Sequence, residues 1–306
     1  MSSDSHIAWV FPGQGSQEPG MGRDLYEQSA AARATYDEAD DLLGRSISRL
    51  CFEAPASEQG KTANSQPAIY VTSVACYRAA REAGVIDAQP GCVAGHSLGE
   101  YSALTAGGAL SFASGLRLVE ARGRLTQAAA DKTHGKMAAI LGLDEAACAA
   151  VCAEAGAELC NINSPSQIVI GGHADAIDRA CTLALASGAK RAIPLDVGGA
   201  FHTSLMAPAA EGMRGEMTTA ALVDSPVPLI ANDRGLPMSD AATIGDELIF
   251  QLTHPVRWVE CVEHMAGAGI TTFIEIGPGR VLSGLIKRIA PQVETKNINS
   301  VASLQQ

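Results

Sequence analysis

The segment "CVAGHSLGEYSAL", residues 92–104, sets Ser97 midway between Gly95 and Gly99 in the spacing G-x-S-x-G. In this motif a strand turns sharply into a helix, and the serine occupies the turn in a strained backbone conformation. An apolar run precedes the motif, as expected of a buried strand, and Glu100 places an acid in the first turn of the helix. The segment therefore predicts a strand–turn–helix unit, in which Ser97 is either a nucleophile or part of a structural glycine-rich turn.

Length and composition indicate a large globular protein. The chain has 306 residues, of which 47% are apolar, so it fits one large domain or a domain with an insertion. Its net charge is −11 and it contains no run of Lys and Arg, so we expect neither nucleic acid nor an anionic membrane as a partner. An acidic partner protein would need a local basic patch. Lys190–Arg191 and Lys287–Arg288 are candidates for it, unless these pairs are simply solvated surface charges.

The cysteines and the apolar runs bear on the compartment. No apolar run is long enough to span a membrane, and the N-terminal residues lack the basic segment of a signal peptide. The eight cysteines are scattered, without a C-x-x-C pair or a matching pair of histidines. Such cysteines are typical of reduced, mostly buried thiols, so we expect a cytoplasmic protein without a bound metal.

Strands and helices alternate through most of the chain, which predicts a parallel sheet covered by helices on both faces. Residues 136–195 differ, because they read as strand, helix, two strands, helix and strand, the order of a ferredoxin-like unit. We therefore expect an α/β core of residues 1–132 and 198–306, an inserted subdomain of residues 133–197, and a ligand cleft between them. In the core, strands are expected at 7–11, 92–95, 228–231 and 272–276, and helices at 30–43, 66–83, 111–130 and 257–267.

A serine nucleophile needs a base, and histidine is the usual one. His96 directly precedes Ser97, so its side chain should point away from that of the serine. We prefer His202, which lies where the chain returns from the insertion to the core, and keep His254, which precedes Pro255 at a helix end, as the alternative. A hydrolase of this architecture would carry an acid between the serine and the histidine. None stands on a strand-end loop, so a backbone carbonyl is another possible partner of the histidine.

Arg122 lies on the apolar face of its predicted helix, together with Leu118 and Leu125. On another face, Glu120 is spaced to pair with Arg124. A guanidinium among apolar side chains needs an acceptor such as a carboxylate, and the helix offers none on this face. Three explanations remain open: a distant structural acid, a side-chain stem that lies along the apolar surface, or a carboxylate that arrives with a substrate.

Seven motifs follow one another along nearly the whole chain. They are "FPGQGSQ" (11–17), "GHSLGEYSAL" (95–104), "EARGRLTQ" (120–127), "NINSPSQIVIGGH" (161–173), "AFHTSLM" (200–206), "QLTHPVRW" (251–258) and "IEIGPGRVLSGL" (274–285). With these motifs in this order, the sequence resembles the malonyl-CoA:acyl carrier protein transacylases of bacterial fatty acid synthesis and the related acyltransferases of polyketide synthases. The resemblance implies an α/β-hydrolase-like core with a ferredoxin-like insertion, in agreement with the order of elements above.

The resemblance also implies roles for individual residues. Ser97 carries the acyl group and His202 is its base. The main-chain carbonyl of Gln251 holds that histidine, which accounts for the missing aspartate. The backbone N–H groups of Gln14 and Leu98 form the oxyanion hole.

By the same resemblance, Arg122 binds the carboxylate of the substrate, and Phe201 before the base favours a malonyl over a methylmalonyl unit. The expected activity is transfer of a malonyl group from malonyl-CoA to the phosphopantetheine thiol of an acyl carrier protein, through a malonyl-serine intermediate. We expect a monomer that needs no cofactor. The alternatives are a trans-acting acyltransferase of a polyketide pathway, a serine thioesterase or other hydrolase, and a non-catalytic subunit of a larger synthase.

Overall fold

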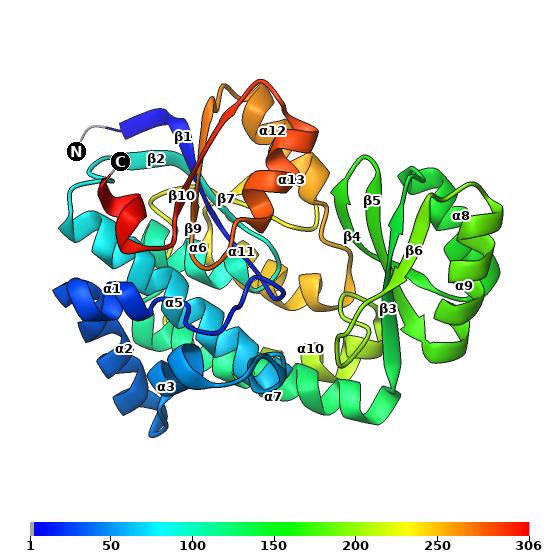
Figure 1. Cartoon of the computed structure of the whole chain (residues 1–306), viewed down its shortest axis with the longest axis horizontal. Coiled ribbons are helices and arrows are strands. Elements are labelled where there is room, and N and C mark those ends of the chain that lie inside the picture. Colours follow the sequence, from blue (N-terminus) through cyan, green and yellow to red (C-terminus); the bar gives the residue numbers. More distant parts are fainter. Residues whose placement is uncertain (1–2, 306) are drawn as a thin grey trace.

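In the computed structural model, which describes residues 3–305, the larger β-sheet has the strand order β10-β9-β1-β2-β7-β8 (Figure 1). The first five of these strands run parallel, and β8 pairs antiparallel with β7 at one edge. The prediction of an α/β fold around a parallel sheet is therefore confirmed. The strands are β1 (Ser3–Phe11), β2 (Gln89–Gly95), β7 (Leu229–Ile230), β8 (Pro237–Met238), β9 (Thr272–Ile276) and β10 (Glu294–Ile298).

Helices bury both faces of this sheet. Along β1, Trp9 and Phe11 join one core cluster, whereas Ala8 and Val10 join another. Successive side chains of a strand point to opposite faces, so these two clusters lie on opposite sides of the sheet. Figure 1 shows α12 and α13 on one side of the strands and α5 and α7 on the other. These covering helices are α5 (Thr62–Glu82), α7 (Phe112–Thr133), α12 (Trp258–Gly267) and α13 (Val281–Ile289).

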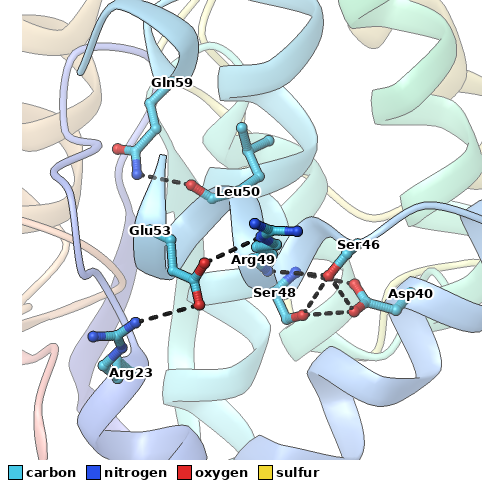
Figure 2. Close-up of polar contacts among 8 residues, drawn as sticks. All are labelled: Arg23, Asp40, Ser46, Ser48, Arg49, Leu50, Glu53 and Gln59. Atoms are coloured by element: carbon cyan, nitrogen blue, oxygen red, sulfur yellow. Dashed lines mark hydrogen bonds and ion pairs between the residues drawn. The ribbon is translucent and has the colours of Figure 1, made fainter. Parts of the chain in front are cut away.

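Side-chain contacts join the short helices near the N-terminus (Figure 2). Glu53 pairs with Arg49 at 3.1 Å and with Arg23 at 3.8 Å, so it links two of these helices. The buried Gln59, at the end of α4, donates to the main-chain oxygen of Leu50 in α3 at 2.9 Å, which joins these two helices. The helices outside the two covering layers are α1 (Arg23–Gln28), α2 (Ala30–Leu43), α3 (Ile47–Glu53), α4 (Ala56–Gln59), α6 (Gly99–Gly107), α10 (Ala207–Met217) and α11 (Ala241–Phe250), with 3₁₀ turns η1 (Ser204–Met206), η2 (Gln251–Thr253) and η3 (Val301–Gln305).

Residues 135–194 form a second sheet, ordered β4-β5-β3-β6, in which neighbouring strands are antiparallel. Its elements follow the predicted order of strand, helix, strand, strand, helix and strand. Helices α8 and α9 cover one face, whereas Met137 and Val169 on the other face pack against Phe201. The elements are β3 (Gly135–Leu141), α8 (Glu145–Ala155), β4 (Glu158–Ser164), β5 (Gln167–His173), α9 (Ala174–Ala186) and β6 (Arg191–Pro194).

The start of α5 differs from the prediction. The helix begins at Thr62 rather than at residue 66 and contains Pro67 in its interior. A proline has no N–H to donate to the carbonyl four residues earlier, which here belongs to Ala63. Arg45 Nη2 donates to this oxygen at 3.5 Å instead, so a side chain from outside the helix supplies the missing donor.

The predicted pairing of Glu120 with Arg124 is wrong. Glu120 pairs with Arg45 at 2.8 Å, and Arg124 pairs with Glu216 in α10 at 3.3 Å. Both partners come from neighbouring segments that the helix packs against, so tertiary contacts override the spacing of four residues. Among the residues that the structure describes, no helix is both long and apolar enough to cross a membrane.

Candidate active site

Ser97 occupies a tight turn between β2 and α6. Its φ of 53° lies in the left-handed region, which is rare for a residue other than glycine. A Cβ on Gly95 would lie 1.9 Å from the carbonyl carbon of Gly99, and a Cβ on Gly99 would lie 2.1 Å from the main-chain oxygen of Phe11. Both glycines are therefore required by the close approach of strand, turn and helix, and the predicted strand–turn–helix unit is present.

His202 contacts Ser97 directly, although 105 residues separate them in the chain. Its Nε2 lies 2.7 Å from Ser97 Oγ. Its Nδ1 lies 2.6 Å from the main-chain oxygen of Gln251 and 3.2 Å from that of His254. Carbonyl oxygens only accept hydrogen bonds, so Nδ1 must carry the proton and Nε2 presents a lone pair to the serine hydroxyl. This is the arrangement that a general base requires.

Burial and charge keep the His202 ring neutral. Burial, and then the positive charge of Arg122, lower the pKa of His202 to about 3, against the opposing effect of the hydrogen bond to the Gln251 carbonyl. The main chain of His202 is also in the left-handed region, with a φ of 61°. A neutral imidazole fixed at hydrogen-bond distance from a hydroxyl can accept its proton at physiological pH.

The ring of His254 faces elsewhere. Its Nδ1 lies 2.9 Å from the main-chain oxygen of Phe250, and it stacks on the Phe250 ring with 3.5 Å between centroids. His96, as predicted, points away from Ser97, and its Nε2 contacts Asn163 Oδ1 at 2.8 Å. Of the three histidines considered as a base, only His202 is within hydrogen-bond distance of the serine hydroxyl in the described part of the chain.

Arg122 is buried, and its hydrogen-bond partners are neutral. Its Nη1 donates to Gln66 Oε1 at 2.8 Å, and its Nη2 donates to Ser97 Oγ at 2.9 Å and to Gln251 Oε1 at 3.2 Å. Within residues 3–305 it forms no ion pair, and its Nε has no hydrogen-bond partner. Burial lowers the pKa of this arginine. Of the three explanations left open by the sequence, an exposed stem does not fit. The buried acid Glu100 acts on Arg122 only from a distance, and no carboxylate of the described residues contacts the guanidinium, so the site can accept an anion supplied from outside.

A cavity of about 360 Å³ opens in front of Ser97 between the two sheets. Gln14 and Leu98 line it, and the main-chain N–H group of neither residue has a hydrogen-bond acceptor within the described residues. The loop that carries Gln14 is pressed against the turn, because a Cβ on Gly13 would lie 2.3 Å from the main-chain oxygen of His96. Two free N–H groups beside a serine can bind a developing oxyanion. The opposite wall includes Met137, Asn161, Leu195, Val197 and Phe201.

The sequence did not single out Asn232 or Gln66. Asn232 directly follows β7, and its Oδ1 accepts from the Ser97 N–H at 2.6 Å while its Nδ2 donates to the Gly95 carbonyl at 2.7 Å. Gln66 fixes Arg122 and donates to Thr126 Oγ1 at 3.2 Å. Asn232 stands just beyond the carboxyl end of a parallel strand, where ligand-binding residues gather, and this position was a usable signal. Nothing in the pattern around Gln66 marked it.

The cysteines and the acidic residues form no metal-binding group. All eight cysteines are free, and burial raises the pKa of the Cys92 thiol to about 12. Across residues 3–305, no three His, Cys, Asp or Glu side chains are arranged to hold a metal ion.

Known proteins share both the sequence and the fold of this chain. The sequence pattern of the acyl transferase domain matches residues 8–306. A malonyl CoA-acyl carrier protein transacylase from Bacillus subtilis (strain 168) is 45% identical over 98% of this chain and 96% of its own length. The crystal structure of an acyl carrier protein S-malonyltransferase from Vibrio cholerae is 43% identical and superposes with a TM-score of 0.94 over 98% of this chain and 99% of that chain. A malonyl-transacylase solved in complex with its type II PKS acyl-carrier protein is 40% identical, with a TM-score of 0.94 over 98% of both chains.

Proposed function

The chain belongs to the acyl transferase family and, within it, to the malonyl-CoA:acyl carrier protein transacylases, and from this premise we propose that it transfers a malonyl group from malonyl-CoA to the phosphopantetheine thiol of an acyl carrier protein. The observation that carries the proposal is the buried Arg122, whose Nη2 lies 2.9 Å from Ser97 Oγ and which has no anionic partner of its own in the described residues. A carboxylate that enters with the acyl group would supply that partner.

In the first half-reaction, Ser97 Oγ attacks the thioester carbonyl carbon of malonyl-CoA and gives its proton to His202 Nε2. The carbonyl oxygen becomes an oxyanion, which the N–H groups of Gln14 and Leu98 stabilise. The C–S bond then breaks, and the CoA sulfur leaves with the proton that His202 returns. The product is malonyl-Ser97 with a neutral histidine.

In the second half-reaction, the thiol of the carrier's phosphopantetheine gives its proton to His202 and attacks the ester carbonyl. Collapse of the second tetrahedral intermediate breaks the C–Oγ bond, and His202 returns the proton to Ser97 Oγ. Gln251 supports both halves through its main-chain oxygen, which holds Nδ1 of His202 at 2.6 Å. In each half-reaction His202 passes one proton from the attacking group to the leaving group, and no oxidation state changes, so the proposed chemistry calls for no metal and no redox cofactor.

Arg122 supplies the preference for a malonyl group. A guanidinium can hold a carboxylate through two parallel hydrogen bonds, and an acetyl group offers nothing equivalent. In the free site one of the arginine's N–H groups is used on Ser97 Oγ. A bound carboxylate would compete for this donor and leave Ser97 Oγ with its hydrogen bond to His202. Phe201, which borders the cavity, suits the small malonyl unit.

We further infer how the chain is divided. The larger sheet with its helices fits an α/β-hydrolase-like core of residues 1–132 and 198–306, supported by the serine at the turn after β2. Residues 133–197 fit a ferredoxin-like subdomain, supported by the antiparallel order β4-β5-β3-β6. Eight free cysteines suit a reducing compartment, and we place the reaction in the cytoplasm.

A second candidate differs only in the carrier. The 40% identical malonyl-transacylase was solved with a type II PKS acyl-carrier protein, so a polyketide carrier is an alternative acceptor to the carrier of fatty acid synthesis. A serine hydrolase is disfavoured, because the partner of His202 is a carbonyl oxygen rather than a carboxylate.

The experiment is to incubate the protein with malonyl-CoA alone and measure its intact mass. We expect one malonyl group, on the peptide that contains Ser97, and none on Ser97→Ala. Addition of a holo-carrier should then move the group to the carrier thiol rather than release it to water. An adduct that survives in Ser97→Ala would overturn the assignment of the serine, and release to water alone would indicate a hydrolase.

A further inference from the structure

A carboxyl group lies directly behind the active-site turn and takes no part in the proposed chemistry. Glu100, in the first turn of α6, is completely buried. Its Oε1 accepts from the Asn232 N–H at 2.9 Å, and its Oε2 accepts from Gln251 Nε2 at 3.0 Å. These two donors belong to segments that follow β7 and α11, more than 130 residues away in sequence. One buried side chain therefore joins three separate segments of the site.

Glu100 determines which way the Gln251 amide points. The NH₂ group of this amide faces Glu100 and also donates to the main-chain oxygen of Ser97 at 3.1 Å. Its oxygen accepts from Arg122 Nη2 at 3.2 Å. Glu100 Oε2 accepts from the amide NH₂ group and the guanidinium only donates, so the two groups on either side of the amide permit a single orientation. If the amide reversed, its NH₂ group would face the guanidinium and both hydrogen bonds would be lost.

Glu100 also fixes the backbone of Asn232, whose side chain clamps the turn. Asn232 Oδ1 accepts from the Ser97 N–H at 2.6 Å, and its Nδ2 donates to the Gly95 carbonyl at 2.7 Å. The clamp thus holds the two peptide groups that flank His96 while Ser97 keeps its left-handed φ. A strained residue persists where its surroundings over-determine it, and these hydrogen bonds are what over-determine Ser97.

We propose that Glu100 is the positioning residue of this site: it sets the Gln251 amide that orients Arg122 and the Asn232 clamp that orients Ser97. The inference deepens the proposed function and rests on it, because Arg122 matters to positioning only if it binds the substrate carboxylate. Glu100 itself touches neither substrate nor the reacting atoms. It acts through Gln251 on selectivity and through Asn232 on the rate of acylation.

The decisive variant is Glu100→Gln, which preserves shape and burial. A glutamine has one acceptor oxygen, so it can satisfy Asn232 or Gln251 but must present its NH₂ group to the other. We expect kcat with malonyl-CoA to fall about 10- to 100-fold, as misplacement of a reacting group commonly causes. The preference for malonyl-CoA over acetyl-CoA should shrink as well, because Arg122 loses its oriented partner. A loss of stability alone would leave this preference unchanged.

The matched control is Glu275→Gln. Glu275 is also a buried carboxyl that accepts from main-chain N–H groups, those of Leu282 and Ser283, but it forms no hydrogen bond to Gln251, Asn232 or Ser97. We expect its kcat and its selectivity to stay within about twofold of the wild type. Asn232→Asp should lower kcat while keeping the malonyl preference, since Asn232 does not contact Arg122.

The outcomes separate this inference from the proposed function. If the wild-type protein forms no malonyl-Ser97, the proposed function fails first. If it does, a folded Glu100→Gln variant with wild-type kcat and selectivity overturns the positioning role, as does an equal loss in a folded Glu275→Gln variant. Should Glu100→Gln fail to fold, as judged by circular dichroism, Asn232→Asp decides, and a wild-type kcat in that variant would overturn the inference.

Discussion

The two sheets face the same cavity with opposite chemistry. The larger sheet places polar groups at the carboxyl ends of its parallel strands: Gln14 follows β1, Ser97 follows β2 and Asn232 follows β7. The smaller sheet contributes an apolar wall, which includes Met137 and Leu195. The reacting groups and their hydrogen-bond network therefore belong to one region, and the other region shapes the space in front of them.

This difference follows from how each sheet is covered. Helices bury both faces of the larger sheet, so its strand ends are the positions left for polar side chains. Helices α8 and α9 cover only one face of the smaller sheet. Its other face carries Met137 and Val169 and has no covering helix; Phe201 packs against it, and Met137 and Phe201 line the cavity. An apolar face without a covering helix thus becomes the wall of a binding site.

His202 lies on the segment that joins the two regions, yet its ring contacts Ser97 of the larger one. Its replacement should therefore have the largest effect on the reaction. We expect His202→Ala to slow acylation by about 10²- to 10⁴-fold, the usual contribution of a general base. His254→Ala should cost much less, since only its carbonyl faces His202 and a carbonyl survives the substitution. The rate of malonyl-Ser97 formation in a quenched-flow experiment measures both. A larger loss in His254→Ala than in His202→Ala would show that His202 is not the base.

Arg122→Ala tests whether the polar groups of the larger region also select malonyl-CoA over acetyl-CoA. Removal of one member of a buried ion pair costs about 3–5 kcal/mol. Here the other member is the substrate, so kcat/KM for malonyl-CoA should fall about 10²- to 10³·⁵-fold. Acetyl-CoA has no carboxylate and should not suffer this loss. Arg122→Lys should restore only part of the malonyl activity, since an ammonium cannot form the two-pronged contact.

The measurement is kcat/KM for both thioesters in the wild type and in the two variants. An equal loss on malonyl-CoA and acetyl-CoA would mean that Arg122 supports the fold or Ser97 and does not bind a carboxylate.

The same arginine should contribute, after burial, to the pH dependence of the base. Burial and the charge of Arg122 lower the pKa of His202 to about 3, and the neutral ring is the active form, so acylation should persist as pH falls until it passes this pKa. Without Arg122 the pKa should rise towards the ordinary value of about 6.5, and the rate should fall at a higher pH. Labelling of Ser97 by a neutral fluorophosphonate between about pH 4.5 and 8 tests this without a carboxylate. Identical acid limbs in wild type and Arg122→Ala would contradict it.

The sequence predicted the reacting and substrate-binding residues better than the residues that hold them in place. Ser97 was found because G-x-S-x-G is a local pattern, and Arg122 stood out because a charge at a helical apolar position breaks a local rule. Gln66 and Asn232 were missed because their roles exist only through partners 56 and 135 residues away. The sequence places Glu100 correctly in the first turn of its helix, but it gives no sign of the hydrogen bond from Gln251.

The secondary structure shows the same division between local and tertiary causes. The segment 30–43 is predicted with the bounds that α2 has, because its helical pattern is a local signal; in the structure Ser29 and Gly44 cap its two ends. The start of α5 was misplaced, since the donor from Arg45 that compensates for Pro67 comes from another segment. Pairing of Glu120 failed for the same reason.

The smallest expected effect concerns the surface of the smaller region. Register places Arg191 opposite Leu141 and Leu141 opposite Gln167, and Arg288 of α13 donates to Gln167 Oε1 at 2.9 Å. The two predicted cationic pairs, Lys190–Arg191 and Lys287–Arg288, therefore lie at one end of this sheet. An acidic carrier protein would meet positive charge there although the whole chain carries −11.

Charge reversal of either pair should raise KM for the carrier by about 3- to 10-fold, because exposed ion pairs contribute only about 0.2–1 kcal/mol each. KM for malonyl-CoA should stay unchanged, and the effect on the carrier should weaken as salt screens the charges. Reversal of Arg23 and Arg49, which flank Glu53 on the N-terminal helices (Figure 2), provides a matched control of equal charge. If both double variants and the control give the same carrier KM as the wild type, neither of the two cationic pairs takes part in docking.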